Sequence, residues 1–219
     1  MIILYIYEYV YKRVIYFNQK MKRSCVLFNM LYFKKMNNNK LLHQLEKIEE
    51  LKKNTKYDNF SLRELQQLPS FNGLCELHFN NLPFYMINIL NDDAVPLKYL
   101  WRNYYEELSA KLWFEMTRFN GYFFDVGAHT GIYSILGNLG KSENNIISIE
   151  PYFLNFSRLL SNLKINNIET KNCLLGAATN TEGVAKFSIN SNLDYHTSGG
   201  VVSEAVSYTH LTLPTILLV

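Results

Sequence analysis

The sequence predicts an α/β fold in which a parallel sheet follows an N-terminal helical and hairpin extension. Between residues 121 and 190, short apolar runs alternate with amphipathic helical stretches, and this strand–helix–strand–helix–strand order indicates parallel strands with right-handed connections. A glycine-containing turn joins the first strand to the first helix. Apolar residues make up 48% and charged residues 19% of the 219 residues, which excludes a wholly disordered chain.

The extension, residues 36–120, is expected to contain a helix, a hairpin and a second helix. Apolar residues recur at i, i+4 and i+7 within residues 37–53, the spacing of one helical face. Residues 73–91 hold two apolar runs around the pair Asn80 and Asn81, which predicts a hairpin, and Pro83 places the second run at a sheet edge. Residues 104–118 then have a helical pattern.

The sheet domain is expected to occupy residues 121–205. The predicted strands are residues 122–126, 145–149, 170–175 and 184–189, and the predicted helices are residues 132–139 and 153–166. The first strand has a predicted neighbour on one side only. We therefore expect an incomplete sheet with that strand as an open hydrophobic edge, which favours aggregation.

Both ends of the chain differ from the rest. Residues 1–35 have no clear period, and charges interrupt the apolar run where a signal peptide would be continuous. We expect the natural chain to start at Met36, with a short amphipathic anchor as the alternative reading of residues 1–35. Residues 206–215 read VSYTHLTLPT, which resembles a translated DNA-sequencing adapter. We therefore expect residues 206–219 to be foreign to the natural protein, and a genuine β-strand is the alternative.

Composition also limits the possible settings and partners. Cys25, Cys75 and Cys173 lack the spacing of a disulfide framework or a CxxC zinc site, and they fit a reducing, cytoplasmic location. Uncharged runs reach about 15 residues, short of the roughly 20 that a membrane span needs, so no transmembrane segment is expected. Residues 1–53 hold 11 Lys and Arg against 4 acidic residues, but abundant Lys, Asn, Ile, Tyr and Phe are typical of AT-rich coding DNA. No nucleic-acid partner is expected.

The turn after the first strand of the sheet carries the motif with the clearest chemical meaning. It reads Asp125-x-Gly127-x-x-x-Gly131, and Glu150 ends the next strand. Gly127 can bring the backbone close to a ligand, and Gly131 can let the new helix pack closely on the strand. Amides of the loop and the helix N-terminus offer donors to a carboxylate or phosphate. Glu150 can accept hydrogen bonds from both hydroxyls of a ribose.

The same loop discriminates between ribose-containing cofactors. A dinucleotide site needs a middle glycine beside the pyrophosphate, but His129 and Thr130 occupy that part of the loop. No Walker-type lysine follows. The turn therefore favours S-adenosyl-L-methionine, which has an amino-acid end and no phosphates, with Asp125 near its methionyl part. A strand-to-helix connection without a ligand is the alternative.

Several segments together carry a family resemblance. They are residues 124–134 (FDVGAHTGIYS), 149–151 (IEP), Asn155 and Phe156, Asn162 and Leu163, Asn166, and residues 175–178 (LGAA) with the turn at Glu182 and Gly183. This pattern, over about residues 86–204, resembles the FkbM family of S-adenosylmethionine-dependent methyltransferases. The resemblance implies a Rossmann-like class I methyltransferase sheet and O-methylation of a small-molecule or glycan hydroxyl, often on a sugar or secondary metabolite.

The resemblance also implies roles by motif position. Those on the methionyl side of the cofactor are Asp125, Gly127, His129 and Gly131; Glu150 would hold the ribose and Leu175 would lie near the adenine. The family often has Asn where this chain has His129. His129 could present a polar edge to the cofactor, and a packed or solvated loop histidine is the alternative.

One part of the family pattern is missing. The next strand of the family, which ends in an acidic segment, is absent together with the strands after it, so we expect an unstable, inactive fragment of a parent enzyme. The catalytic residues stay unassigned, since a loop histidine such as His196 is more often solvated than catalytic, and no metal-ligand cluster is visible. Two rival classes remain open: a nicotinamide-dependent oxidoreductase, which the missing glycines disfavour, and a cofactor- or partner-binding module without catalysis.

Overall fold

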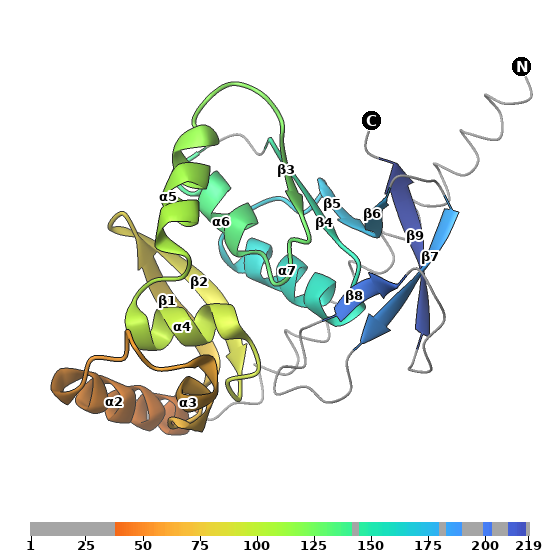
Figure 1. The fold of residues 1–219 in the computed structure, drawn as a ribbon. Coiled ribbons are helices and arrows are strands. Elements are labelled where there is room, and N and C mark those ends of the chain that lie inside the picture. Colours follow the sequence, from red (N-terminus) through yellow and green to blue (C-terminus); the bar gives the residue numbers. More distant parts are fainter. Residues whose placement is uncertain (1–37, 142–144, 180–182, 190–198, 203–209, 218–219) are drawn as a thin grey trace, which may run out of the picture.

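Three sheets and the helices between them make up the described part of the chain. The computed structural model describes residues 38–141, 145–179, 183–189, 199–202 and 210–217, with side chains for residues 43–141 and 145–178 (Figure 1). The helices are α2 (Asn38–Asn54), α3 (Leu62–Gln67), α4 (Ala94–Arg102), α5 (Glu107–Met116), α6 (Ile132–Asn138) and α7 (Phe153–Ile165). The strands are β1 (Asn72–Phe79), β2 (Leu82–Ile89), β3 (Phe123–Val126), β4 (Ile146–Glu150), β5 (Cys173–Leu175), β6 (Ala177–Thr179), β7 (Gly183–Ile189), β8 (Gly199–Val202) and β9 (His210–Leu217).

The predicted hairpin is confirmed. β1 and β2 pair antiparallel and form a sheet of their own, with Pro83 near the start of the second strand. The two turn residues, Asn80 and Asn81, have φ of 49° and 62°. Asparagine tolerates this left-handed region, and two such residues in a row give the turn that matches the twist of the flanking strands.

The predicted parallel sheet is confirmed over three strands. β3, β4 and β5 pair in parallel in that order, and α6 and α7 connect them (Figure 1). β3 lies at one edge, as predicted for the first strand. Asp125 is buried, whereas Phe124 and Val126 on the other face of β3 are 50% and 51% exposed. The described residues thus leave one face of this strand uncovered, although parallel sheets are usually covered on both faces.

Helix α7 holds the hairpin through two asparagine side chains. Asn162 Oδ1 accepts a hydrogen bond from the N–H of Ile87 at 2.9 Å, and Asn166 Oδ1 accepts one from the N–H of Tyr85 at 2.8 Å. Asn166 Nδ2 donates back to the Tyr85 carbonyl at 2.7 Å. These amides pair with the edge of β2 as a neighbouring strand would. They satisfy the Ile87 N–H and both backbone groups of Tyr85.

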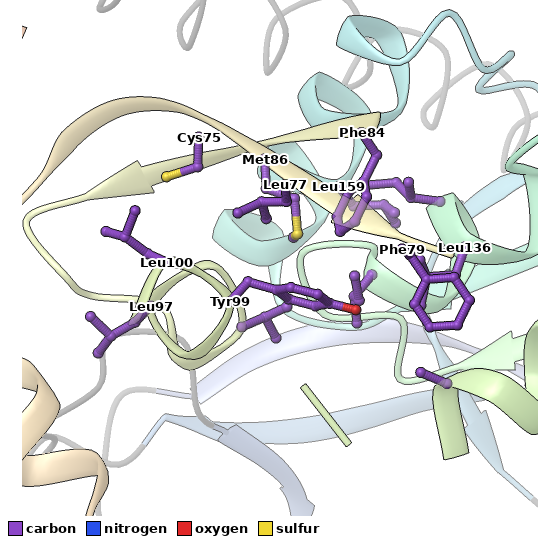
Figure 2. Packing of buried hydrophobic residues seen from close by; sticks show 14 of the residues in the cluster. Cys75, Leu77, Phe79, Phe84, Met86, Leu97, Tyr99, Leu100, Leu136 and Leu159 are labelled. Carbon is purple, nitrogen blue, oxygen red and sulfur yellow. The ribbon is translucent and has the colours of Figure 1, made fainter. Parts of the chain in front are cut away.

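A single hydrophobic core joins the extension to the sheet. Side chains labelled in Figure 2 come from β1 (Cys75, Leu77, Phe79), β2 (Phe84, Met86), α4 (Leu97, Tyr99, Leu100), α6 (Leu136) and α7 (Leu159). The rings of Phe84 and Tyr99 meet edge to face, with centroids 5.3 Å apart. Residues 36–120 and 121–205, predicted as extension and sheet domain, therefore share their packing.

Three helices of the extension differ from the sequence-based prediction. α3, a six-residue helix capped by Ser61, was not predicted. α4 was not predicted; its Pro96 stands in the first turn, where a missing N–H breaks no helical hydrogen bond. α5 is shorter than the predicted helix over residues 104–118, because Glu106 has a φ of 44° and the helix begins after it. The apolar side chains Leu108 and Leu112 of α5 face outward, at 82% and 60% exposure.

The last described strands form the third sheet. Its order is β6-β9-β7-β8, and β7 corresponds to the strand predicted at residues 184–189. β9 comes from the segment predicted to be foreign and pairs parallel with β6 and antiparallel with β7. The pairing of β9 shows how this segment folds but does not test where it comes from. The foreign origin of residues 206–219 therefore stays a prediction. The predictions for residues 1–35 and for His196 lie outside the described residues.

We expect Asn162→Ala to lower the free energy of unfolding by about 3 kcal/mol, because it leaves the Ile87 N–H and the Thr130 carbonyl without their partner. Urea unfolding of the full chain measures this. Lys164→Ala, at an exposed position of the same helix, is the control and should change the value by less than about 0.5 kcal/mol. Equal values for the two variants would contradict the role of Asn162.

Candidate functional site

The loop between β3 and α6 folds back on the end of β4. The N–H groups of Gly127 and Ala128 both donate to the Ile149 carbonyl, at 2.8 and 3.0 Å. Gly127, His129 and Gly131 have φ of 75°, 53° and 101°. A left-handed conformation costs a non-glycine residue about 1–2 kcal/mol, so contacts around His129 must hold it there.

The two glycines of the motif meet different demands. A Cβ on Gly131 would lie 2.6 Å from Cδ1 of Leu159, so Gly131 permits a close approach to α7. The sequence had suggested a close approach to the strand instead. A Cβ on Gly127 would meet no heavy atom within 4 Å. Open space beside a glycine backbone at the end of a strand is what close approach of a ligand requires.

Glu150 anchors the loop with both carboxylate oxygens. Oε2 accepts the N–H of His129 at 2.8 Å, and Oε1 accepts the N–H of Tyr152 at 2.9 Å and Nδ2 of Asn155 at 3.5 Å. Glu150 is 4% exposed, and burial raises its pKa although these hydrogen bonds oppose the shift. Because a carboxylate has about four lone-pair sites, three bonds leave capacity for a further donor.

Asp125 lies beneath α6 and ties three elements together. Its Oδ2 accepts a hydrogen bond from the Ser134 hydroxyl at 2.5 Å, and that hydroxyl lies 2.7 Å from Oγ of Ser148. Burial raises the pKa of Asp125 to about 6, and the hydrogen bonds from Ser134 oppose this shift. These contacts join β3, α6 and β4 under the loop. A position of Asp125 near the methionyl part of a cofactor stays a prediction.

His129 points toward the N-terminus of α4. Its Nδ1 lies 3.3 Å from Thr130 Oγ1 and 3.9 Å from Oδ1 of Asp93. The His129 side chain is 31% exposed, whereas that of Asp93 is fully buried. The imidazole therefore stands between a buried carboxylate and the surface, an arrangement that the sequence did not predict.

Three of the predicted residues meet at the carboxyl ends of neighbouring strands. Gly127 follows β3, Glu150 ends β4, and Leu175 ends β5 opposite Glu150 in the register. The N–H of Gly176 donates to the Glu150 carbonyl at 3.2 Å, which fixes the two strand ends together. Open α/β sheets bind ligands at this edge. His129 joins the group through Glu150, and Gly131 and Asp125 support it from α6 and β3.

Contacts from distant parts of the chain also hold the loop. Asn162 Nδ2 donates to the Thr130 carbonyl at 2.8 Å. Arg158 on α7 binds both carboxylate oxygens of Asp92, at 2.8 and 2.7 Å. The family pattern contained Asn162, which could have signalled its importance but not its partners. Asp92 and Asp93 stand in no short-range sequence pattern that could have predicted their partners.

The loop amides differ from the expectation that they would serve a phosphate or carboxylate. The N–H groups of Gly127, Ala128 and Gly131 donate to carbonyls of the protein. That of His129 donates to Glu150. Four loop donors are thus already satisfied, and the side chains around them are rich in carboxylates. Such a loop suits a ligand that brings donors or positive charge.

A groove elsewhere in the molecule lies away from this edge. It is lined by residues 138–141, 145, 166–169 and 171 together with Pro83, and none of the six predicted site residues is among them.

In the part of the chain that the structure describes, no group of three or more His, Cys, Asp or Glu side chains could hold a metal ion. None of the described helices is long and apolar enough to cross a membrane.

The chain was compared with known proteins, and it matches no family model, no curated protein and no solved structure.

The pKa of Asp125 predicts a pH dependence of stability. The native state holds this proton up to a pH of about 6, whereas the unfolded chain releases it near the ordinary value of 3.8. Between these values the native state binds more protons, so this residue makes the free energy of unfolding fall as pH rises, by about 3 kcal/mol in total. Asp125→Asn should remove this contribution.

The measurement is urea unfolding of both proteins from pH 4 to pH 8. The stability of Asp125→Asn relative to wild type should rise between about pH 4 and pH 6 and stay level above about pH 6.5. A difference that is constant over the whole range would show that Asp125 titrates normally.

Proposed function

We propose that the protein is an S-adenosyl-L-methionine-dependent methyltransferase that O-methylates a small-molecule or glycan hydroxyl, such as that of a sugar or secondary metabolite. The observation that carries the proposal is the meeting of Gly127, Glu150 and Leu175 at the carboxyl ends of three neighbouring parallel strands. The resemblance of residues 124–134 to the FkbM turn supports the choice of cofactor.

The residues present fit such a cofactor part by part. The open space at Gly127 admits a ligand against the backbone. Glu150 retains acceptor capacity for a ribose hydroxyl after its three bonds to the protein. Leu175 gives an apolar contact at the end of the next strand, where an adenine would lie.

A sulfonium cofactor suits this loop better than a dinucleotide does. A pyrophosphate needs backbone N–H groups directed at it, but four of those in the loop donate to protein acceptors. The nearby acids Asp125, Glu150 and Asp93 would repel phosphate and attract a cation. These observations support the methyltransferase over a nicotinamide-dependent oxidoreductase.

The protein's part in the reaction is binding and orientation. When bound, S-adenosylmethionine supplies an electrophilic methyl group. In-line substitution requires the acceptor oxygen about 3 Å from the methyl carbon, so a loop that is fixed in advance lowers the entropic cost of alignment. Glu150 and Asn162 hold the loop in this way, through the His129 N–H and the Thr130 carbonyl.

A cytoplasmic setting accompanies this proposal. Cys75 and Cys173 are buried and form no disulfide among the described residues. Thiols outside disulfides are typical of reducing compartments.

Gly127→Ala should weaken S-adenosylmethionine binding at least tenfold, because its Cβ enters the space proposed for the ligand. Gly121→Ala is the matched control: Gly121 also has positive φ, at 140°, and open space around a built Cβ, but it precedes β3. Isothermal titration calorimetry of the full chain measures both, and Gly121→Ala should bind like wild type. Equal losses in the two variants would argue for backbone strain and against a ligand at Gly127.

Glu150→Ala should also weaken S-adenosylmethionine binding tenfold or more, since charged hydrogen bonds contribute roughly 1.5–3 kcal/mol each. Glu169→Ala, at an exposed position outside the proposed site, is the control. Unchanged affinity of Glu150→Ala would remove the ribose assignment. Tighter binding of a nicotinamide dinucleotide by wild type would favour the oxidoreductase, and binding without turnover of any hydroxyl acceptor would favour a non-catalytic module.

A further inference from the structure

Asp93 is a fully buried carboxylate directly behind the loop. It caps α4, with Oδ1 accepting the N–H of Val95 at 2.9 Å. The same oxygen lies 3.9 Å from Nδ1 of His129. Its other oxygen, Oδ2, is buried and has no hydrogen-bond partner among the described residues. A buried carboxylate oxygen without a donor is costly, so its retention here calls for a compensating interaction.

The nearest fixed cation compensates this carboxylate only in part. Arg158 Nη1 lies 3.9 Å from Asp93 Oδ2, beyond hydrogen-bond distance, while the guanidinium binds both oxygens of Asp92. Burial alone would lower the pKa of Arg158, but Asp92 and Asp93 raise it, so the group stays charged. Two carboxylates therefore share one guanidinium, which leaves one negative charge in excess.

Two other groups near Asp93, Cys75 and Tyr105, are uncharged at neutral pH. On β1, burial and then the charge of Asp93 raise the pKa of the Cys75 thiol, which stays protonated. Tyr105 is similarly neutral, because burial and neighbouring acids raise its pKa. A further neighbour is His129, in the loop that follows β3. The excess charge thus lies 3.9 Å from a side chain of the loop that the proposed cofactor would approach.

We propose that Asp93 is a specificity-determining residue whose buried charge favours a cationic ligand at the Gly127–Gly131 loop over its uncharged counterpart. This inference rests on the proposed function. There it means that the protein discriminates between S-adenosylmethionine, a sulfonium, and the thioether S-adenosylhomocysteine that remains after transfer. The methyl carbon leaves sulfur and bonds to the acceptor oxygen, the S–C bonding pair stays on sulfur, and the hydroxyl proton goes to solvent. The positive charge on sulfur is therefore lost with each turnover, which favours product release.

Asp93→Asn tests the charge without removing the helix cap, since asparagine caps helices as well as aspartate does. Calorimetric titration of the full chain with each of the two ligands gives the two dissociation constants. We expect the affinity for S-adenosylmethionine to fall about tenfold, as for a unit charge acting over a few ångströms at an intermediate dielectric constant. The affinity for S-adenosylhomocysteine should change less than about twofold, because the thioether carries no charge there.

Two further variants separate charge from structure. Glu169→Gln removes the same charge at an exposed position outside the site and should leave both affinities unchanged. Asp93→Ser, a second good cap without charge, should reproduce the selective loss. Thermal unfolding of Asp93→Asn should show a melting temperature no lower than that of wild type, because an uncompensated buried charge has been removed.

The other possible results would contradict either the role of Asp93 or the proposed function. Equal loss of affinity for both ligands would make Asp93 a structural residue only, as would failure of both Asp93 variants to fold. An unchanged ratio of the two affinities would show that its charge is not felt at the ligand. Wild-type protein that binds neither ligand would refute the proposed function itself, and the role of Asp93 would fall with it.

Discussion

The side-chain amide of Asn162 is the contact on which the rest of this arrangement depends. An amide offers an acceptor and a donor at once, and Asn162 uses both, the first on β2 and the second on the loop after β3. It thereby fixes the hairpin and the loop to the same turn of α7. The ion pair between Asp92 and Arg158 lies one turn earlier on that helix and reinforces the same joint. Moving α7 would displace the hairpin, α4 and the loop together.

How much of this could be predicted from the sequence depended on the range of each interaction. Period-2 and period-3.6 patterns located the strands and helices of the parallel sheet, and the pair Asn80 and Asn81 located the hairpin turn, because these signals are local. The loop glycines and Glu150 were found for the same reason. The contact of Asp93 with His129 and the bonds of Asn162 join residues more than 30 positions apart, and no local pattern specifies such pairs. α4 was not predicted because it is only nine residues long and contains a proline, so its helical pattern is weak.

The carboxylates of Asp125 and Glu150 both make hydrogen bonds within the protein. Sequence position alone suggested that Asp125 and Glu150 face a ligand, whereas both are engaged within the protein, by Ser134 and by the loop backbone respectively. A buried acid that holds its own loop costs desolvation energy, but it orders the backbone before any ligand arrives. A ligand hydroxyl that meets Glu150 would find an acceptor whose orientation is already set, which reduces the ordering that binding requires.

The exposed apolar side chains of α5, of β3 and of the segment between them have a practical consequence for the protein in solution. Large side chains at Leu108, Leu112, Phe119, Phe124 and Val126 are all at least half exposed. Salts that are excluded from protein surfaces, such as ammonium sulfate, strengthen the association of exposed apolar groups. Salting-out should therefore begin at lower salt than for a chain of the same net charge with a polar exterior. Purification conditions that suit the molecule are those of modest ionic strength.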